Sequence, residues 1–404
     1  MRILENNDPD SLKEEEIDSF LAEVKKNREK PLDDKFKVAF FYTANAGVVY
    51  HRTIKFADLM RAKGIGVAYG NDFNTVLGGA AYDPYNQATA SWENELNINI
   101  VVNKIEGICR CADVIVFGLF HTEQALALLK ALKTAEGTKD KIYLMEYDDN
   151  FLDVPSYNGA SVYYFPGSPK ITVGIEQMKL SDGVIASTPY LAKLASQYNK
   201  NTYVIPNNMD FRIADAVVPD KHDDIRVVWE GASMHEDNIQ IIKPAVQEAL
   251  KNPNVSFYCL GGQPNFFPEL KEFKNFHHIQ AWKIITEYYQ YFGSFGFDIG
   301  LAPLIDNAFN RGKSNLRLID YSAFKIATIA SPVEPYMNSI NGGNGLFAKE
   351  PEEFTSALKY LIEKEDARKV IGNEAYKWAK QNHDLDKVTD TYISLLKKIN
   401  GEKR

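Results

Sequence analysis

The chain has 404 residues, 45% of them hydrophobic, and a formal net charge of −8. This length allows two domains, each with its own hydrophobic core. The negative charge argues weakly against a general affinity for DNA or anionic membranes, although it is compatible with a local basic groove. The highly charged residues 1–30 do not resemble a signal peptide, and no apolar run reaches the roughly 20 residues that span a bilayer. We therefore expect a cytoplasmic protein.

Cysteine is rare in this chain and occurs at Cys109, Cys111 and Cys259. An odd and sparse set is typical of proteins from a reducing compartment. Cys109 and Cys111 are close enough in sequence to share a metal, but no second pair accompanies them. Buried or incidental thiols are therefore the favoured interpretation.

The first half of the chain alternates short apolar runs with helical patterns. An amphipathic helix over residues 11–30 comes first, and we interpret it as a cover for the first domain rather than a partner-binding arm. The strands are predicted at residues 36–42, 65–69, 113–117 and 141–145, and within residues 182–190 and 202–208. Strands that alternate with helices predict a parallel sheet.

Several polar residues of this half follow predicted strands, and ligands of parallel sheets bind beyond the carboxyl ends of the strands. Gly47 follows the first strand, where a small residue lets the backbone approach a ligand. His121 follows another predicted strand. A lone His is usually structural, but at the carboxyl end of a strand a functional role is about as expected as a structural one. The acidic run Glu146–Asn150 could hold a metal, which is a rival interpretation. Against a metal, the predicted nucleotide-binding half follows these acids instead of preceding them.

The second half repeats the pattern after a boundary near Asn208–Asp220. Its strands are predicted at residues 225–229, 255–260, 297–302 and 326–331, and its helices at residues 236–251, 314–324, 352–364 and 366–400, the last interrupted near His383. Residues 297–331 form a strand, a polar loop, a helix capped by Ser314 and a second strand. This is a βαβ unit, the building block of a parallel sheet.

The loop of this βαβ unit carries Arg311, Gly312 and Lys313 directly before the helix that starts at Ser314. Free N–H groups and the positive end of the helix dipole favour a phosphate there. A solvated basic turn is the alternative. Asp320 favours the phosphate site, because a carboxylate roughly two turns later could bind a ribose while the loop binds the phosphate. A second such loop before a helix contains Gly231, Ser233 and His235.

Residues 297–331 resemble the donor-binding segment of the nucleotide-sugar glycosyltransferases of family 4, which have the GT-B fold. That family's signature is a Glu, seven residues and a second Glu. Asp320 falls on the second acidic position, and Gly312 stands at the first. Phe309 and Lys313–Ser314 fit a branch of the family that carries a Phe and a Lys-Ser pair here. Further similarity lies at Val184–Asn208 and Glu146–Asn150.

The resemblance implies an α/β protein of the GT-B fold, with two Rossmann-like domains whose parallel sheets face a central cleft. A C-terminal helix would cross back to the first domain. The implied domains are a helical extension at residues 1–34, an acceptor domain at 35–207, a donor domain at 208–383, and a final helix at 384–404 that packs on the first domain.

The implied enzyme is a retaining hexosyl- or pentosyltransferase. It would move a sugar from a nucleotide-diphosphate sugar, UDP- or GDP-linked, to a hydroxyl acceptor, without a metal or other cofactor. The family usually has an Arg and a Lys after the first strand of the donor domain, and this chain lacks that Lys. The implied catalytic residues are Arg311, Lys313 and His121. The implied donor contacts are Gly47, Arg52, Gly231, Ser233, His235, Trp282, Ser314, Asn315 and Asp320.

Three alternatives stay open. A non-catalytic nucleotide-sugar-binding or partner subunit would explain why the first acidic position is missing. A glycosyltransferase that acts on modified bases in DNA would share the fold, although the acidic net charge does not favour a nucleic acid partner. A two-lobed sugar-binding protein would share the α/β halves, but such proteins are usually exported.

Overall fold

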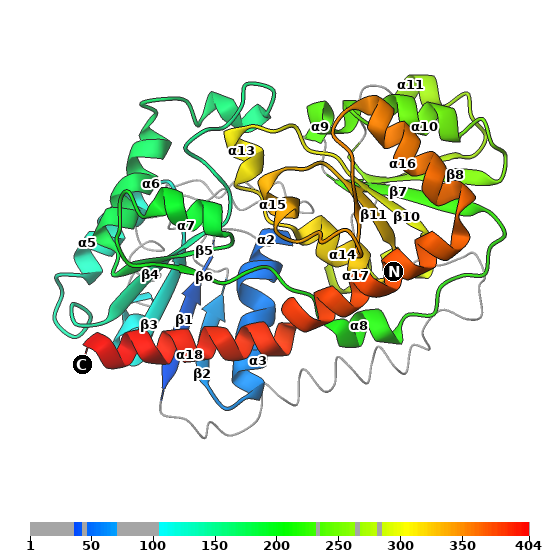
Figure 1. Ribbon diagram of the computed structural model, residues 1–404. Helices are drawn as coiled ribbons and strands as arrows, with labels where there is room; N and C mark the ends of the chain where they lie inside the picture. The colour runs from blue at the N-terminus through cyan, green and yellow to red at the C-terminus, as the bar shows by residue number, and fades with distance from the viewer. Residues whose placement is uncertain are drawn as a thin grey trace. The chain divides into compact units, whose positions relative to one another are not determined.

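The computed structural model describes residues 36–42, 47–70, 105–231, 235–262, 267–280 and 285–403. The helix predicted at residues 11–30 lies outside them. The chain divides into two compact units (Figure 1). The N-terminal unit contains the described residues up to Asn207, together with Gly312–Ser314 and Asp386–Arg404. The C-terminal unit contains Asn208–Arg311 and Asn315–Leu385.

The N-terminal unit is built on a six-stranded parallel sheet in the order β2-β1-β3-β4-β5-β6. Its strands are β1 Lys37–Phe41, β2 Gly66–Gly70, β3 Val114–Gly118, β4 Ile142–Tyr147, β5 Gly183–Ala186 and β6 Thr202–Val204. Nearly all residues of β3, β4 and β5 are buried, as expected for parallel strands covered on both faces. The predicted parallel sheet is confirmed.

The helices of the N-terminal unit begin where the sequence supplies capping side chains. Thr122, Ser168 and Thr188 each accept a hydrogen bond from a backbone N–H in the first turn of the helix that follows. The helices are α2 Gly47–Val49, the π-helix η1 Tyr50–Ile54, α3 Lys55–Ala62, α5 Glu123–Leu132, the 3₁₀ helix η2 Gly159–Val162, α6 Pro169–Leu180, α7 Pro189–Ala195 and α18 Leu385–Lys403.

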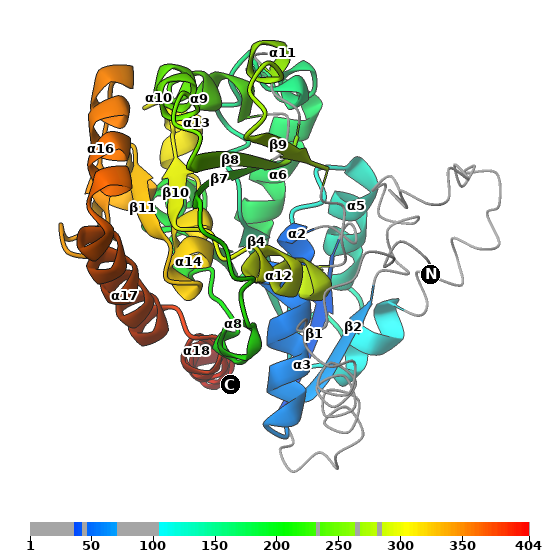
Figure 2. The same ribbon diagram turned by 90° about the vertical axis from the view of Figure 1, so that its right-hand side faces the viewer.

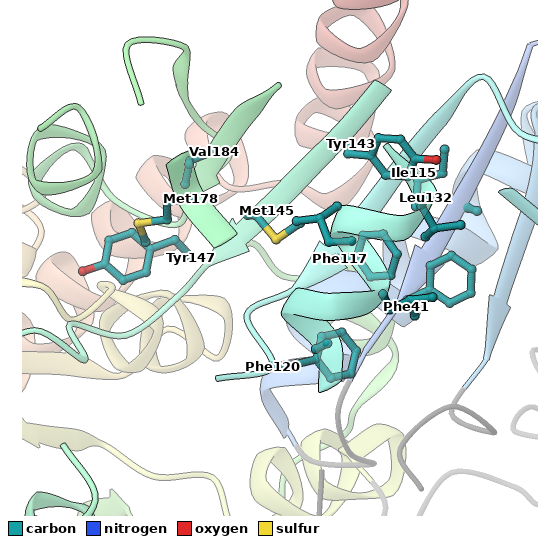
Figure 3. Packing of buried hydrophobic residues seen from close by; sticks show 14 of the residues in the cluster. Phe41, Ile115, Phe117, Phe120, Leu132, Tyr143, Met145, Tyr147, Met178 and Val184 are labelled. Atoms are coloured by element: carbon teal, nitrogen blue, oxygen red, sulfur yellow. The ribbon is translucent and has the colours of Figure 1, made fainter. Parts of the chain in front are cut away.

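One face of this sheet carries a cluster of large side chains (Figure 3). Tyr143, Met145 and Tyr147 come from alternate positions of β4 and therefore share a face. Phe117 of β3 stacks on Phe41 of β1 with 4.9 Å between ring centroids. Since each fully buried side chain of this size contributes about 1.5–3 kcal/mol, the cluster fixes the neighbouring strands β1, β3 and β4 together.

The last helix, α18, packs on the N-terminal unit (Figure 1). Tyr392 of α18 meets Phe56 of α3 edge-on at 5.2 Å between ring centroids. Lys63, just after α3, pairs with Asp390 at 2.9 Å. The predicted return of the final helix to the first domain is therefore part of the observed fold.

The C-terminal unit has its own six-stranded parallel sheet, in the order β12-β11-β10-β7-β8-β9. Its strands are β7 Ile225–Gly231, β8 Val255–Gly261, β9 Phe276–Ile279, β10 Ile299–Ala302, β11 Ala327–Ala330 and β12 Leu346–Phe347. The sequence predicted most of these strands to within two or three residues.

The helices of this unit cover its sheet, with α16 beside α10 and α17 beside α14 (Figure 2). They are α8 Phe211–Ala216, α9 Glu236–Gln240, α10 Lys243–Ala249, α11 Phe267–Leu270, α12 Ile285–Ser294, α13 Ala308–Arg311, α14 Leu316–Ala323, α15 Glu334–Met337, α16 Pro351–Glu363 and α17 Glu365–Asn382. The chain breaks between α17 and α18, where the backbone oxygen of His383 accepts a hydrogen bond from the N–H of Met209 at 2.9 Å. No helix among the described residues is long and apolar enough to cross a membrane.

Three local predictions are wrong. The single helix predicted at residues 236–251 is two helices, α9 and α10, because Pro244 starts a new helix more readily than it continues one. The polar loop predicted at residues 306–313 contains α13, whose first turn is capped by the side chain of Asn307. Ser314 does not cap α14: the N-cap residue is Asn315, and the Ser314 hydroxyl accepts a hydrogen bond from Asn207.

Candidate functional site

Each sheet reverses its strand order once, between β1 and β3 and between β7 and β10. Ligands of such sheets bind at these reversals, outside the carboxyl ends of the strands. The N-terminal unit contains the predicted site residues Gly47, Arg52, His121, Lys313 and Ser314. The C-terminal unit contains Gly231, His235, Arg311, Asn315 and Asp320. Ser233 and Trp282 lie outside the described residues.

Arg52 lies in the π-helix after β1, and only 2% of its side chain is exposed. Its Nε donates a hydrogen bond to Glu146 Oε1 at 2.6 Å, and its Nη1 donates one to Asn207 Oδ1 at 3.0 Å. Burial raises the pKa of Glu146, and the adjacent guanidinium opposes that shift. The described geometry therefore gives Arg52 a positioning role in the N-terminal unit, and the predicted donor contact stays a prediction.

The segment Gly312–Ser314 is bound at each residue by the N-terminal unit. Lys313 Nζ pairs with Asp149 Oδ1 at 2.8 Å. Asn207 donates to the Ser314 hydroxyl at 2.8 Å, and the Thr188 hydroxyl donates to the Gly312 carbonyl at 3.5 Å. The sequence placed Lys313 beside a phosphate, and the structure adds that a carboxylate at the end of β4 already neutralises it.

His121 follows β3 with a backbone φ of +44°, a conformation that few residues other than glycine adopt. Its Nδ1 lies 3.2 Å from the carbonyl oxygen of Lys170. A carbonyl can only accept, so Nδ1 carries the proton and Nε2 the lone pair. Burial lowers the pKa of His121 to about 4. The ring is therefore neutral near pH 7, and it meets Phe151 edge-on at 4.4 Å between centroids.

In the C-terminal unit, Asn238 connects the loops after β7 and β10. Its Nδ2 lies 3.2 Å from His235 Nδ1, while its Oδ1 accepts hydrogen bonds from the Ile305 backbone and from Asn310 Nδ2, both at 2.9 Å. Asn238 is buried, so this small network fixes the start of α9 against α13. The predicted loop residue His235 is part of it.

Arg311 and Asn315 flank the short segment that the N-terminal unit binds. Arg311, at the end of α13, is exposed and pairs with both carboxylate oxygens of Asp306, at 2.6 and 3.1 Å. Asn315 donates to the Ser339 hydroxyl at 2.9 Å. An exposed ion pair of this kind contributes about 1 kcal/mol or less, so Arg311 can exchange Asp306 for another anionic partner at little cost.

Asp320 is a buried residue of α14, and its Oδ1 accepts a hydrogen bond from the Tyr289 hydroxyl at 2.9 Å. The preceding tyrosine of α12, Tyr288, donates a hydrogen bond to Glu230 at the carboxyl end of β7. Two adjacent tyrosines therefore orient two carboxylates. The sequence predicted Asp320 as a site residue but did not single out Glu230.

Tyr321, next to Asp320, packs at the reversal between β7 and β10. Its hydroxyl accepts from the N–H of Glu230 at 3.2 Å and lies 3.4 Å from the carbonyl of Leu301. The ring lies against β10 at Gly300, where a Cβ would come within 2.3 Å of it. Gly300 is therefore required for α14 to approach the sheet this closely.

Arg317 is the functional candidate that the sequence interpretation missed. It lies at the start of α14, one turn before Asp320 and on the same helix face. Its guanidinium lies over the Trp229 ring, 5.6 Å from the centroid. In the sequence, its position three residues before Asp320 was the feature that could have identified it as a candidate site residue.

Metal-binding groups are limited in this part of the molecule. Within the described ranges, no group of three or more His, Cys, Asp or Glu side chains is arranged to hold a metal ion. Cys109 and Cys259 are buried thiols, and Cys111 is an exposed one. The predicted rival site at Glu146–Asn150 is divided, since Glu146 binds Arg52 and Asp149 binds Lys313.

Two Rossmann-like units on parallel six-stranded sheets, with the last helix returned to the first unit, define the GT-B fold of glycosyltransferases. The predicted fold class is confirmed. Much of the C-terminal unit, together with the start of α18, also matches a family model: residues 240–394 match the model described as "Glycosyl transferase-like". The chain thus contains a glycosyltransferase-like domain, while membership in family 4 stays a prediction.

Solved structures share the same fold. Sucrose-phosphate synthase from Thermosynechococcus elongatus has a TM-score of 0.65 at 14% identity, over 91% of this chain and 100% of that one. A glycosyltransferase from Rickettsia africae has a TM-score of 0.63 at 15% identity, over 91% and 99%. Anabaena HepE, solved in complex with UDP and glucose, has a TM-score of 0.61 at 14% identity, over 90% and 100%. A comparison with curated proteins gives no match.

Proposed function

We propose that this protein is a retaining glycosyltransferase that transfers a sugar from a nucleotide-diphosphate sugar to a hydroxyl acceptor without a divalent metal. The observation that carries the proposal is the position of Asp320. It is a buried carboxylate of α14, oriented by Tyr289 and adjacent to Tyr321 at the reversal of the C-terminal sheet, and it lies within the matched glycosyltransferase-like residues 240–394. A carboxylate in this setting can accept hydrogen bonds from ribose hydroxyls.

The chemistry requires positive charge near the donor. Breaking the sugar–phosphate bond builds negative charge on the leaving diphosphate, and fixed cations that stabilise this charge lower the barrier. Arg311 and Lys313 are the cations that the sequence places just before α14. Their present partners, Asp306 and Asp149, are at least half exposed, so a diphosphate can compete with them.

No protein base is assigned to the reaction. In a retaining transfer of this kind, the leaving phosphate itself can take the proton of the acceptor hydroxyl. His121 is neutral near pH 7, because burial lowers its pKa to about 4. It therefore contributes a hydrogen bond to the sugar or acceptor, not a positive charge. This role supports catalysis without proton transfer through the imidazole.

The donor is proposed to be UDP-linked, with GDP-linked sugars as the alternative. HepE was solved with UDP-glucose as well as with UDP, and its fold is similar to that of this chain at 13% identity. Such a likeness concerns the fold, so the base and the sugar are open to a direct screen. The acceptor is a hydroxyl compound of unassigned class.

The test is release of nucleoside diphosphate from UDP- and GDP-sugars, measured with and without excess EDTA. We expect release from one donor series, unchanged turnover in EDTA, and reduced release at subsaturating donor in Asp320→Ala. Complete loss in EDTA, restored by Mn²⁺ or Mg²⁺, would contradict metal independence. Binding of a donor without any release, across a panel of sugar and lipid acceptors, would favour a non-catalytic binding subunit instead.

A further inference from the structure

The C-terminal unit contains a cation whose partners are unusual. Arg317 forms no ion pair with a carboxylate among the described residues, and its Nε is buried without a hydrogen-bond partner. Tyr336 is close enough to hydrogen-bond to the guanidinium, and Glu230 attracts it through space. A largely enclosed guanidinium normally has an anionic partner, so an arginine beside a sheet reversal that pairs with no carboxylate of the described residues points to an anionic ligand.

The backbone next to Arg317 makes room for its guanidinium at the end of β7. Gly231 ends β7, and a Cβ on it would lie 3.0 Å from Arg317 Nη2 and 2.7 Å from the Trp229 ring. A side chain at this position would therefore press on the guanidinium and on the ring under it. The glycine keeps Arg317 at the carboxyl end of β7, where ligands of a parallel sheet bind.

The position of Arg317 relative to Asp320 fits the shape of a nucleotide diphosphate. The two residues are three apart on α14, so they lie on one face and about one turn from each other. Asp320 lies deeper in the helix, and Arg317 is nearer its N-terminus. If Asp320 binds the ribose, the phosphates of the same molecule extend toward the helix N-terminus, the end that favours anions.

The other predicted phosphate ligands differ from Arg317. Arg311 holds Asp306 and Lys313 holds Asp149, so both already have a carboxylate partner. Glu230, the carboxylate whose charge acts on Arg317, accepts its hydrogen bond from Tyr288 instead. Arg317 is also only partly buried, so its side chain is not closed off from solvent.

We propose that Arg317 binds the diphosphate of the nucleotide donor. This assignment rests on the proposed function, since it requires a nucleotide-sugar site at Asp320. Arg317 contacts the phosphates, and Asp320 contacts the ribose. The guanidinium is held for this contact by the Trp229 ring below it and by Tyr336 beside it.

A series of ligands with zero, one and two phosphates can separate the phosphate contact of Arg317 from the ribose contact of Asp320. Isothermal titration would compare uridine, UMP and UDP, and in parallel guanosine, GMP and GDP, on the full chain. Arg317→Met should weaken the preferred diphosphate by about 10- to 100-fold and the monophosphate less, and should leave the nucleoside within about twofold. Arg317→Lys should recover part of the loss, because it keeps the charge without the planar fork. Asp320→Ala should weaken all three probes by a similar factor.

Arg226→Met is the matched control. Arg226 also lies over an aromatic ring, Tyr258 at 5.9 Å, but it belongs to the amino end of β7. This variant should bind every probe as the wild type does. Thermal unfolding of each variant would check that it is folded.

The outcomes are distinct. If wild-type protein binds neither diphosphate, the proposed function and this assignment fall together. If it binds one and Arg317→Met binds equally well, the assignment alone is wrong. An equal loss for nucleoside and diphosphate in Arg317→Met would likewise overturn it, because that pattern belongs to a structural arginine.

Discussion

Arg52 in the N-terminal unit and Arg317 in the C-terminal unit both lie near the carboxyl edge of a parallel sheet, yet their surroundings differ. Arg52 is almost fully enclosed, and its nitrogens donate to Glu146 and to Asn207. Arg317 has an aromatic ring below it and forms no ion pair with a carboxylate among the described residues. Burial alone does not mark an arginine as functional. The discriminating feature is whether the protein already supplies the anion.

The largest expected effect tests this contrast through stability. Arg52→Met leaves the Glu146 carboxylate buried without its cation, and breaking such a pair typically costs about 3–5 kcal/mol. Arg317→Met removes a stacked guanidinium that has no carboxylate bonded to it, and should cost about 1–2 kcal/mol. Urea unfolding of both variants would measure the two losses of unfolding free energy.

The control for this comparison is Arg110→Met in the same unit as Arg52. Arg110 pairs with Glu106 at the surface, four residues away on one helix, so its loss should cost under about 0.5 kcal/mol. If Arg317→Met were as destabilising as Arg52→Met, Arg317 would be a structural residue. The contrast between the two arginines would then disappear.

The next effect concerns Lys313 and Asp320, which we expect to act on different parts of one donor. Lys313 lies where charge grows as the sugar–phosphate bond breaks, so Lys313→Ala should lower kcat on the order of 100-fold or more. Asp320 would bind ribose hydroxyls that hardly change during the reaction. Asp320→Ala should therefore raise KM and weaken the nucleoside diphosphate by roughly 1.5–3 kcal/mol.

Steady-state kinetics with the preferred donor, together with titration of the diphosphate, would separate these two effects. Lys193→Ala is a suitable control, because Lys193 lies in the last turn of α7 and has no assigned role in the site. Wild-type kinetics in both Lys313→Ala and Asp320→Ala would mean that neither side chain contacts the donor. In that case the candidate site would have to be abandoned.

The order of strands and helices could be predicted from the sequence, because buried parallel strands consist of continuous apolar runs. The run at residues 297–302 and the run at residues 326–331 contain β10 and β11, with a helix between them as predicted. The break near His383 was also predicted from the sequence. These features depend on local patterns and on known connections between strands, whereas the return of α18 was implied by the family resemblance.

The candidate site was only partly predictable, since its details depend on contacts between residues distant in sequence. Ser314 had the composition of an N-cap, but Asn207, more than a hundred residues earlier, uses its hydroxyl. Arg317 was passed over because nothing in its neighbourhood of the sequence shows that Trp229 lies beneath it or that Gly231 makes room for it. Asp320 was recognised from its position two turns after the basic loop and from the family pattern, not from the contacts that bury it.

The smallest effect uses pH to compare the two units. Burial lowers the pKa of His121 from 6.5 to about 4, with the positive charge of Lys170 acting in the same direction and the hydrogen bond to the Lys170 carbonyl opposing it. His277 of β9 is partly exposed and stacks on Tyr258, and its pKa is lowered mainly by burial. His121 should therefore make the larger contribution to the pH dependence of stability.

The sign follows from proton binding. Between pH 6.5 and about 4 the unfolded chain binds a proton at His121 and the folded chain does not, so the stabilisation present above pH 6.5 is lost as the pH falls. After allowance for solvent screening this loss should be about 1–2 kcal/mol. Other groups titrate in the same range, so the measurement is the difference in unfolding free energy between wild type and His121→Asn from pH 7 to pH 4. Asparagine tolerates the positive φ of this position. That difference should shrink as the pH falls. The corresponding difference between wild type and His277→Asn should vary less with pH. A wild-type-to-His121→Asn difference that is independent of pH would show that His121 protonates in the folded state as readily as in the unfolded chain.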